Sequence, residues 1–275
     1  MPIVRLVTLS FVTLCTITSS AQNPPKRNYY GVFPNYAISN LIAGADKDRK
    51  LDLQMMIWLI KGSGGKNILV DTGCYHEKVI HGKNIKNFIK PSEALAKLGM
   101  SPGDITDIII SHMHWDHADG MDLFPNAKIW IQKDEFAYYT GAWQPGGKSG
   151  GIDPDDVLTL VKLNTEHKVN LVDGDGKEII DGITVYTGGR HTFASRYVGV
   201  RTTSGTIAIA SDNMYLYENL EKHVPIAQTF DADSNLKALD RMMQIASRPN
   251  LIVAGHDPEV FVKFPKPGNG VARIQ

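Results

Sequence analysis

The sequence predicts an α/β protein with layered sheets. Short apolar runs recur after Pro34 and are separated by Gly, Asp and Asn, which is the pattern of many strands joined by turns. Helical patterns lie between these runs, so strands and helices alternate along the chain. With 275 residues, of which 43% are hydrophobic, the chain can bury a sizeable core without disulfide bonds.

The first half of the chain is expected to contain a hairpin, two short helices and two further strands. In chain order, we expect strands over 55–60 and 67–70 around the turn at Gly62-Ser63-Gly64-Gly65, a helix over 92–98 with Ser92 as its N-cap and Gly99 past its end, strands over 105–110 and 128–131, and a helix over 133–139. The segment 143–156 is rich in Gly and Pro and is expected to form a long surface loop.

The second half repeats this alternation with a different sequence. We expect strands over 169–172, 183–186, 197–201, 206–210 and 251–254. A helix is expected over 233–246, capped by Asp233 or Ser234. Its apolar face would carry Leu236, Leu239, Met243 and Ile245.

The first 21 residues have the pattern of a secretory signal peptide. Arg5 adds a positive charge, residues 6–17 are largely apolar, and Ser19-Ser20-Ala21 places small residues at a cleavage position. The apolar run is shorter than the roughly 20 residues that a membrane-spanning helix needs. We therefore expect export to the periplasm or the medium, removal of residues 1–21, and a single domain over 22–275 with no stable membrane anchor.

The charge balance argues against a nucleic-acid-binding protein, and the cysteine count argues against a fold held by disulfide bonds. The chain has 29 basic and 29 acidic residues, and the basic ones are scattered, so nucleic acid is not an expected partner. Removal of residues 1–21 would leave Cys74 as the one cysteine. An exported chain without an intrachain disulfide must be held by its core or by metal.

Four potential metal ligands lie within six residues, directly after the strand expected over 105–110. The segment is His112-Met113-His114-Trp115-Asp116-His117. Imidazole and carboxylate groups are ligands for zinc and related divalent ions. A single histidine is more often satisfied by the core or by solvent, but this density favours a metal site.

More ligands are expected from the ends of other strands. His191, Asp212 and His256 each follow an apolar strand, the position where open sheets present functional groups. Asp71 also ends a strand, and its expected role is to orient a histidine or to fix the loop. The remaining histidines lie in polar segments and are expected to be solvated: His76, His81, His167 and His223.

With these residues in place, the sequence resembles the dinuclear members of the metallo-β-lactamase superfamily. The pattern His112-x-His114-x-Asp116-His117, followed by His191, Asp212 and His256, carries the resemblance, together with Val70-Asp71-Thr72-Gly73. It spans about Leu53 to Phe261 and implies an αββα sandwich, with residues 22–275 as one catalytic domain.

Within the superfamily, the sequence is most similar to the N-acyl-homoserine lactonases. Asp212-Asn213-Met214-Tyr215 matches their bridging aspartate followed three residues later by a catalytic tyrosine. Relatives often carry a second histidine and a turn glycine after the position of His191, where this chain has Thr192-Phe193-Ala194-Ser195. This departure changes the expected shape of the pocket and leaves the expected ligands intact.

The resemblance implies two divalent ions per chain, with zinc as the expected metal. In the implied assignment, His112, His114 and His191 hold one ion, Asp116, His117 and His256 hold the other, and Asp212 bridges them. The negative charge of the two aspartates suits a pair of cations.

The implied activity is quorum quenching, in which a metal-bound hydroxide opens the ring of a small-molecule lactone substrate. Tyr215 would stabilise the developing oxyanion, and Asp116 would carry a proton to the leaving alkoxide. An acyl tail needs an apolar wall, for which Trp115, Met121 and Phe193 are candidates. Further aromatic and apolar candidates are Phe33, Tyr36, Met55, Phe124, Tyr138, Tyr139 and Trp143.

Three other functions remain open at this point. The same fold could hydrolyse another lactone, an ester or a phosphotriester. A di-iron redox protein could use the same ligands, and a binding module could hold the metal only for structure. The sequence does not determine the acyl-chain preference, the native metal or the oligomeric state.

Overall fold

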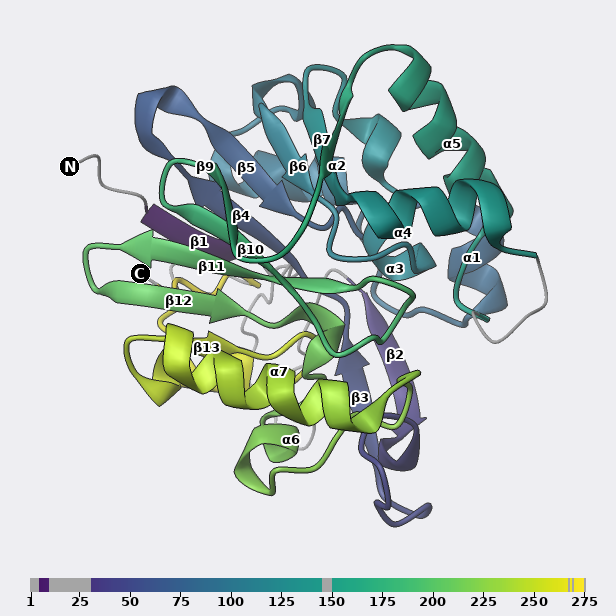
Figure 1. Ribbon diagram of the computed structural model, residues 1–275, viewed down its shortest axis with the longest axis vertical. Coiled ribbons are helices and arrows are strands. Elements are labelled where there is room, and N and C mark those ends of the chain that lie inside the picture. The colour runs from purple at the N-terminus through teal and green to yellow at the C-terminus, as the bar shows by residue number, and fades with distance from the viewer. Residues whose placement is uncertain (1–4, 10–30, 145–149, 267, 269, 275) are drawn as a thin grey trace, which may run out of the picture.

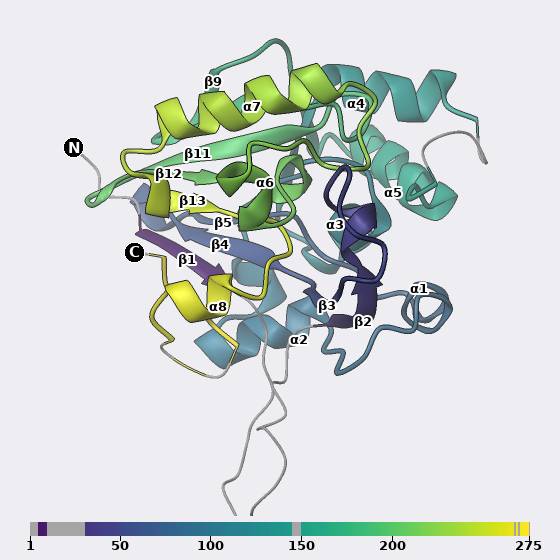
Figure 2. The same ribbon diagram turned by 90° about the horizontal axis from the view of Figure 1, so that it is seen from below.

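Two β-sheets lie at the centre of the molecule, and helices cover the outer face of each sheet (Figures 1 and 2). This computed structural model describes residues 5–9, 31–144, 150–266, 268 and 270–274. The α/β architecture with layered sheets that the sequence predicts is therefore confirmed.

The first sheet has six strands in the order β1-β4-β5-β6-β7-β8. Their bounds are β1 Arg5–Leu9, β4 Ile57–Lys61, β5 Asn67–Val70, β6 Asp107–Ile109, β7 Lys128–Gln132 and β8 Val169–Val172. Strands β5 to β8 are parallel, and β4 pairs with β5 as the predicted hairpin. The carboxyl ends of β5 to β8 consequently lie at one edge of the sheet.

The second sheet has five strands in the order β13-β12-β11-β10-β9. Their bounds are β9 Lys177–Ile180, β10 Ile183–Thr187, β11 Arg196–Thr202, β12 Gly205–Ile209 and β13 Ile252–Val253. A separate hairpin of β2 Val32–Ala37 and β3 Lys50–Gln54 completes the strands. The sequence did not predict β2, β3 or β9.

The α-helices lie around the two sheets (Figures 1 and 2). They are α1 Glu77–Gly82, α2 Pro91–Leu95, α3 Trp115–Ala118, α4 Lys133–Ala137, α5 Pro154–Thr165, α6 Tyr217–Glu221, α7 Ala232–Ile245 and α8 Val260–Lys263. Single turns of 3-10 helix lie at Ile38–Asn40, Ser63–Gly65, Ala96–Leu98, Pro102–Asp104, Met121–Leu123, Ser211–Asn213 and Pro249–Leu251, and a π-helical turn lies at Tyr138–Ala142. No helix in the described part of the chain has the length and apolar character to cross a membrane.

Several predicted boundaries were wrong for local reasons. The expected loop over 143–156 ends at Asp153, whose side chain caps α5 by accepting a hydrogen bond from the Asp155 backbone N–H. Lys90 occupies the N-cap position of α2, so Ser92 lies inside the helix, whereas Gly99 ends the following turn with a φ of 69° as predicted.

Helix α7 also begins and faces the core differently from the prediction. Asp231 caps α7 by accepting a hydrogen bond from the Ser234 backbone N–H at 3.0 Å. Leu239 and Met242 are buried on its inner face, while Met243, predicted for that face, is 43% exposed. Leu236 and Ile245 pack against the same cluster as Leu239, so the predicted face is confirmed except at Met243.

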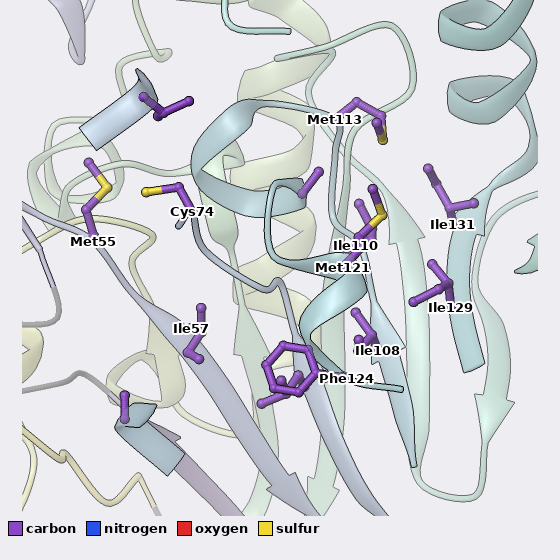
Figure 3. Packing of buried hydrophobic residues seen from close by; sticks show 14 of the residues in the cluster. Met55, Ile57, Cys74, Ile108, Ile110, Met113, Met121, Phe124, Ile129 and Ile131 are labelled. Atoms are coloured by element: carbon purple, nitrogen blue, oxygen red, sulfur yellow. The ribbon is translucent and has the colours of Figure 1, made fainter. Parts of the chain in front are cut away.

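The core forms two apolar clusters on the two faces of the first sheet. Alternate residues of β6 and β7, which include Ile108 and Ile129, point toward the helices on the outer face (Figure 3). Ile109 faces the other way, into a cluster that includes the second sheet and α7. Because both faces of the sheet are buried, its strands are almost continuously apolar.

Residues Arg5–Leu9, inside the predicted signal peptide, form β1 at the edge of the first sheet (Figure 1). The backbone of β1 pairs with β4 in an antiparallel register from Arg5 with Lys61 to Leu9 with Ile57. The predicted cleavage site at Ser19-Ser20-Ala21 lies outside the described residues.

Candidate metal centre

The predicted ligands lie at the ends of strands from both sheets. The cluster from His112 to His117 follows β6 and continues into α3. In the second sheet, His191 follows β10, Asp212 follows β12 and His256 follows β13. Strands β10, β12 and β13 run in the same direction, so these three residues lie at the same edge.

The structure brings all seven predicted ligands together in two adjacent groups. Within each group, one possible ligand atom from each residue lies within 4.8 Å of the others. The first group is His112, His114, His191 and Asp212, and the second is Asp116, His117 and His256. Apart from Asp212, each group contains the three ligands that the resemblance assigned to one ion.

The Asp212 carboxylate lies between the two groups and turns one oxygen to each. Its Oδ2 lies 3.2 Å from His191 Nε2 and 3.7 Å from His112 Nε2. Its Oδ1 lies 2.9 Å from His256 Nε2 and 3.1 Å from the Nε2 of His117. This placement is the geometry that a bridging carboxylate requires.

Four of the histidines have their outer ring nitrogen held by an oxygen atom. The Nδ1 partners are the Gln228 carbonyl for His191 at 2.7 Å, the Gln54 carbonyl for His256 at 2.6 Å, Asp71 for His117 at 2.8 Å and the Ser111 hydroxyl for His112 at 2.9 Å. A ring whose Nδ1–H donates outward presents the lone pair of Nε2 to the centre. Such an outer hydrogen bond is typical of histidines that bind metal.

His114 is oriented differently, with Nδ1 toward the centre and 2.8 Å from His191 Nε2. Its ring lies against the backbone of Gly151, where an added Cβ would meet His114 Cδ2 at 2.6 Å. The Trp115 backbone N–H donates to the Gly151 carbonyl at 2.9 Å. Gly151 therefore allows the segment before α5 to pack onto the centre, a contact that the sequence did not predict.

Several inward atoms of the centre lack a hydrogen-bond partner. The Nε2 atoms of His112 and His117 and Oδ1 of Asp212 are buried and form no aligned hydrogen bond within the described residues. Buried polar atoms without partners are costly unless an ion or water satisfies them. Donor atoms of one tetrahedral zinc ion lie about 3.3 Å apart, close to the separations around Asp212. The residues therefore fit divalent cations.

Burial and charge act on the protonation of the centre in opposite directions. Burial holds the pKa of His112 and of His114 well below the usual value, which keeps both rings neutral. Burial would also lower the pKa of His117, but Asp212 and Asp116 outweigh it and raise this pKa. Negative charge is thus concentrated on the second group, where a cation would offset it.

Asp71 connects the first sheet to the centre, as predicted. It is fully buried, and besides His117 it accepts hydrogen bonds from the Ser111 backbone N–H at 2.7 Å, the Ser111 hydroxyl at 2.8 Å and the Ser211 hydroxyl at 3.0 Å. Its φ of 60° turns the chain sharply after β5. A single carboxylate consequently fixes the residues that precede His112 and Asp212.

A model of the metallo-beta-lactamase superfamily matches residues 52–256, three quarters of the chain. The chain belongs to this superfamily. The seven predicted ligands, from His112 to His256, lie within the matched residues.

Individual members of the superfamily resemble the chain over most of its length. The N-acyl homoserine lactonase of a Bacillus species is 27% identical over 224 residues, which is 76% of this chain and 83% of that protein, and the one from Bacillus cereus is 29% identical over 226 residues with the same coverage. The solved structure of a variant of the Bacillus thuringiensis protein AiiA, with N-decanoyl-L-homoserine at its active site, superposes with a TM-score of 0.71 at 20% identity, covering 96% of this chain and 98% of that one. This structural likeness confirms the metallo-β-lactamase fold.

A cavity of about 620 Å³ opens beside the two groups of ligands. Five of the predicted ligands line it: His114, Asp116, His191, Asp212 and His256. Its remaining lining residues are Phe33, Tyr36, Leu41, Leu53, Met55, Lys83, Trp115, Gly150, Gly151, Tyr215 and Ala227 to Phe230. The segment from Ala227 to Phe230 was missed because no feature of its sequence marks it as a site.

Tyr215 lines this cavity, as its spacing from Asp212 suggested. The residue is 4% exposed, and its hydroxyl lies 3.4 Å from His191 Nδ1. Burial first, and then the negative charge of Asp212, raises the pKa of Tyr215 well above its usual value. The phenol is therefore protonated and can donate a hydrogen bond.

The three predicted substrate contacts lie in different environments. Trp115 lines the cavity. Met121 is buried in the core beneath α3, because the turn at Met121–Leu123 points its side chain inward (Figure 3). Phe193 stacks on Tyr138 at a centroid distance of 4.0 Å and is not among the residues that line the cavity. As substrate contacts, all three stay predictions.

Glu135 supports the centre and was not predicted. It is fully buried and accepts hydrogen bonds from the Met113 backbone N–H at 3.0 Å, the Thr192 hydroxyl at 2.7 Å and the Ala194 backbone N–H at 2.6 Å. These donors lie in the loops that carry His112, His114 and His191. In the sequence, Glu135 looks like an ordinary acidic residue in the first turn of a helix.

The histidines predicted to be solvated do not all behave alike. His223 is exposed and lies 2.9 Å from Asp240 on the surface. His76 is only partly exposed, and its ring contacts Asp119, which itself is buried. His76 is therefore partly solvated, as predicted, and also has a buried partner that the sequence did not predict.

Proposed function

We propose that the chain is a dinuclear zinc hydrolase that opens the lactone ring of N-acyl homoserine lactones. The observation that carries the proposal is the placement of the Asp212 carboxylate between two groups of ligands, with the protonated Tyr215 beside it in the same cavity. The names of the Bacillus relatives support the substrate class.

The seven ligands divide naturally between two ions. His112, His114 and His191 would hold one, Asp116, His117 and His256 would hold the other, and Asp212 would bind both. Divalent ions in such a site lower the pKa of water toward neutrality and polarise a carbonyl group. Histidine and carboxylate donors are the set that zinc accepts in hydrolases.

The residues of the chain orient the substrate and move protons. Tyr215 would donate its phenolic hydrogen bond to the lactone carbonyl oxygen as negative charge develops there. Asp116 lines the cavity, with Oδ2 3.6 Å from the Nε2 atoms of both His117 and His256. Its carboxylate would accept the proton that the attacking water gives up and pass it to the alkoxide that leaves when the ring C–O bond breaks.

The cavity has an apolar wall that suits an acyl chain. Phe33, Leu41, Leu53 and Met55 line it on the side of the β2-β3 hairpin. Ligand cavities commonly combine such a wall with a few polar groups that fix orientation. The acyl tail would extend along this wall, with the lactone ring over Asp212.

An assay of ring opening tests the proposal. The purified zinc-loaded protein should release protons from homoserine lactones of graded acyl length, beside a β-lactam, a phosphotriester and simple aliphatic lactones. We expect the acyl homoserine lactones to give the highest kcat/KM. A fully loaded protein that left them intact and hydrolysed the phosphotriester would contradict the substrate class.

A tyrosine variant separates this mechanism from generic metal-dependent hydrolysis. Tyr215→Phe removes one donor to the carbonyl oxygen and leaves every metal ligand in place. Loss of a single such donor costs about 3 kcal/mol when it acts alone. Here the metal shares the charge, so we expect about 1–2 kcal/mol, roughly tenfold in kcat/KM. Unchanged kinetics at full zinc content would show that Tyr215 is structural.

We also propose that residues 1–21 direct export and are then removed. The basic start, the apolar run and the small residues before Gln22 support this proposal. Cleavage there would remove β1 and leave β4 as the edge strand of the first sheet.

A further inference from the structure

A second cluster of potential metal ligands lies outside the cavity, among α1, α3 and α5. His76 directly precedes α1, Asp119 follows α3, and Asp156 lies in the first turn of α5. One nitrogen or oxygen atom from each of these residues lies within 4.8 Å of the other two. The three residues are distant in sequence, and the fold brings them together.

Asp119 is held rigidly in this cluster. Its Oδ2 accepts hydrogen bonds from the Tyr75 backbone N–H at 2.7 Å and from the His76 backbone N–H at 3.0 Å. Its Oδ1 contacts His76 Nδ1. Because the side chain of Asp119 is 1% exposed, its charge is sheltered from water.

Asp156 is the unexplained member of the cluster. It is 2% exposed, and its Oδ2 has no hydrogen-bond partner within the described residues. Lys78 in α1 forms ion pairs with Asp153, which caps α5, and with Asp155 in its first turn. Asp156 forms no ion pair in the described part of the chain. A buried carboxylate that lies beside a second one and has no direct ion pair is an unfavourable arrangement.

We propose that His76, Asp119 and Asp156 form a further site for a divalent transition-metal ion, separate from the centre at Asp212. One imidazole and two carboxylates form a mixed nitrogen and oxygen donor set, which suits zinc or manganese better than calcium or magnesium. The side chain of His76 is 37% exposed, so water can complete the coordination and the ion can enter from solvent.

Such an ion would join three elements next to the cavity. It would link the start of α1, the end of α3 and the start of α5. Helices α1 and α5 already contact each other through Lys78, which binds Asp153 and Asp155. Helix α3 carries Asp116 and His117, so the site would brace the helix that presents these groups. The role of the ion is therefore structural.

A proton is the competing occupant. Burial first, and then the charges of Asp119 and Asp153, raises the pKa of Asp156 to about 9. A protonated Asp156 could donate its proton to Asp119 and satisfy the pair without metal. The two occupants differ in a measurable quantity, the number of ions bound per chain.

The test is a count of bound ions on the full chain and its variants. Metal-free protein is dialysed against buffered zinc, and bound zinc per chain is measured by elemental analysis. We expect Asp156→Asn to bind one ion fewer than the original chain, because it removes a charged ligand with little change in shape. The matched control is Asp155→Asn, which changes the exposed neighbouring carboxylate and should bind as many ions as the original chain.

A second variant covers the case in which Asp156→Asn does not fold. His76→Gln alters a partly exposed side chain and should also bind one ion fewer than the original chain. Zinc should raise the melting temperature of the original chain more than that of either variant. Equal zinc counts in His76→Gln and the original chain would overturn the proposal. The carboxylates of Asp119 and Asp156 would then share a proton instead of binding an ion.

Discussion

Glu135 gives the sharpest test of how the metal-binding loops are held. Glu135→Gln keeps the size of the side chain and replaces one carboxylate oxygen with an NH₂ group. In the structure, Oε1 accepts from Met113 and Thr192, and Oε2 accepts from the Ala194 backbone N–H. The amide oxygen of glutamine can accept the hydrogen bonds of only one of the two carboxylate oxygens. Its NH₂ group then replaces the other oxygen and faces a donor.

The expected cost follows from these three hydrogen bonds. The substitution removes the charge from all of them and leaves at least one buried N–H facing another donor. A hydrogen bond to a charged group contributes about 1.5–3 kcal/mol, and an unsatisfied buried donor costs about 1–3 kcal/mol. Burial raises the pKa of Glu135, and this desolvation offsets part of the gain from the charge. We therefore expect the free energy of unfolding to fall by about 2–4 kcal/mol.

Urea unfolding of the metal-free protein measures this loss, and competition with a chelator measures its effect on the centre. Substitution of a residue that orients metal ligands typically costs 10–100-fold in metal affinity. The control is Asp134→Asn, which changes the exposed neighbour of Glu135 and should alter the unfolding free energy by less than about 0.5 kcal/mol. Identical unfolding and zinc affinity in Glu135→Gln and Asp134→Asn would refute the supporting role.

Three further predictions concern other parts of the molecule. Asp212→Asn should reduce zinc content and ring opening together, while His223→Ala should change neither; elemental analysis beside the lactone assay checks both. Arg49 holds the pKa of Glu218 at about 2, so the stability from this pair is present above pH ~4.5 and is lost as the pH falls through 2. Arg49→Met should thus lower the melting temperature slightly at pH 7 and leave it unchanged at pH 1.5, which thermal melts can follow. Mass spectrometry of exported protein should find Gln22 at the N-terminus, and an intact Met1 would contradict the proposed cleavage.

The sequence predicted the centre well because its signals are local. The cluster around His112 is a contiguous motif, and His191, Asp212 and His256 each follow an apolar run that is readable as a strand. In a parallel arrangement, strand ends meet at one edge, so the position of each ligand in its own segment was enough to bring it to the site.

What the sequence missed depends on backbone contacts and on tertiary packing. The backbone carbonyl groups of Gln54 and Gln228 orient His256 and His191. Every residue has a backbone carbonyl, so the residue types at these positions do not indicate the contact. Asp156 lies in a Pro-Asp-Asp segment that reads as an ordinary helix start, although it is 2% exposed. Only the packing of α5 against α1 and α3 distinguishes it from its exposed neighbour.

A buried arginine explains how two buried carboxylates are tolerated near the centre. Asp71 and Glu135 are both fully buried anions, and the fully buried Arg196 is the cation whose charge acts on both. Arg196 donates through Nε to the Ile110 carbonyl, just after β6, at 3.0 Å and through Nη2 to the Trp130 carbonyl in the middle of β7. Burial lowers its pKa to about 9, so it remains charged at neutral pH. The guanidinium group thus offsets the two carboxylates while fixing the strand from which the first ligands extend.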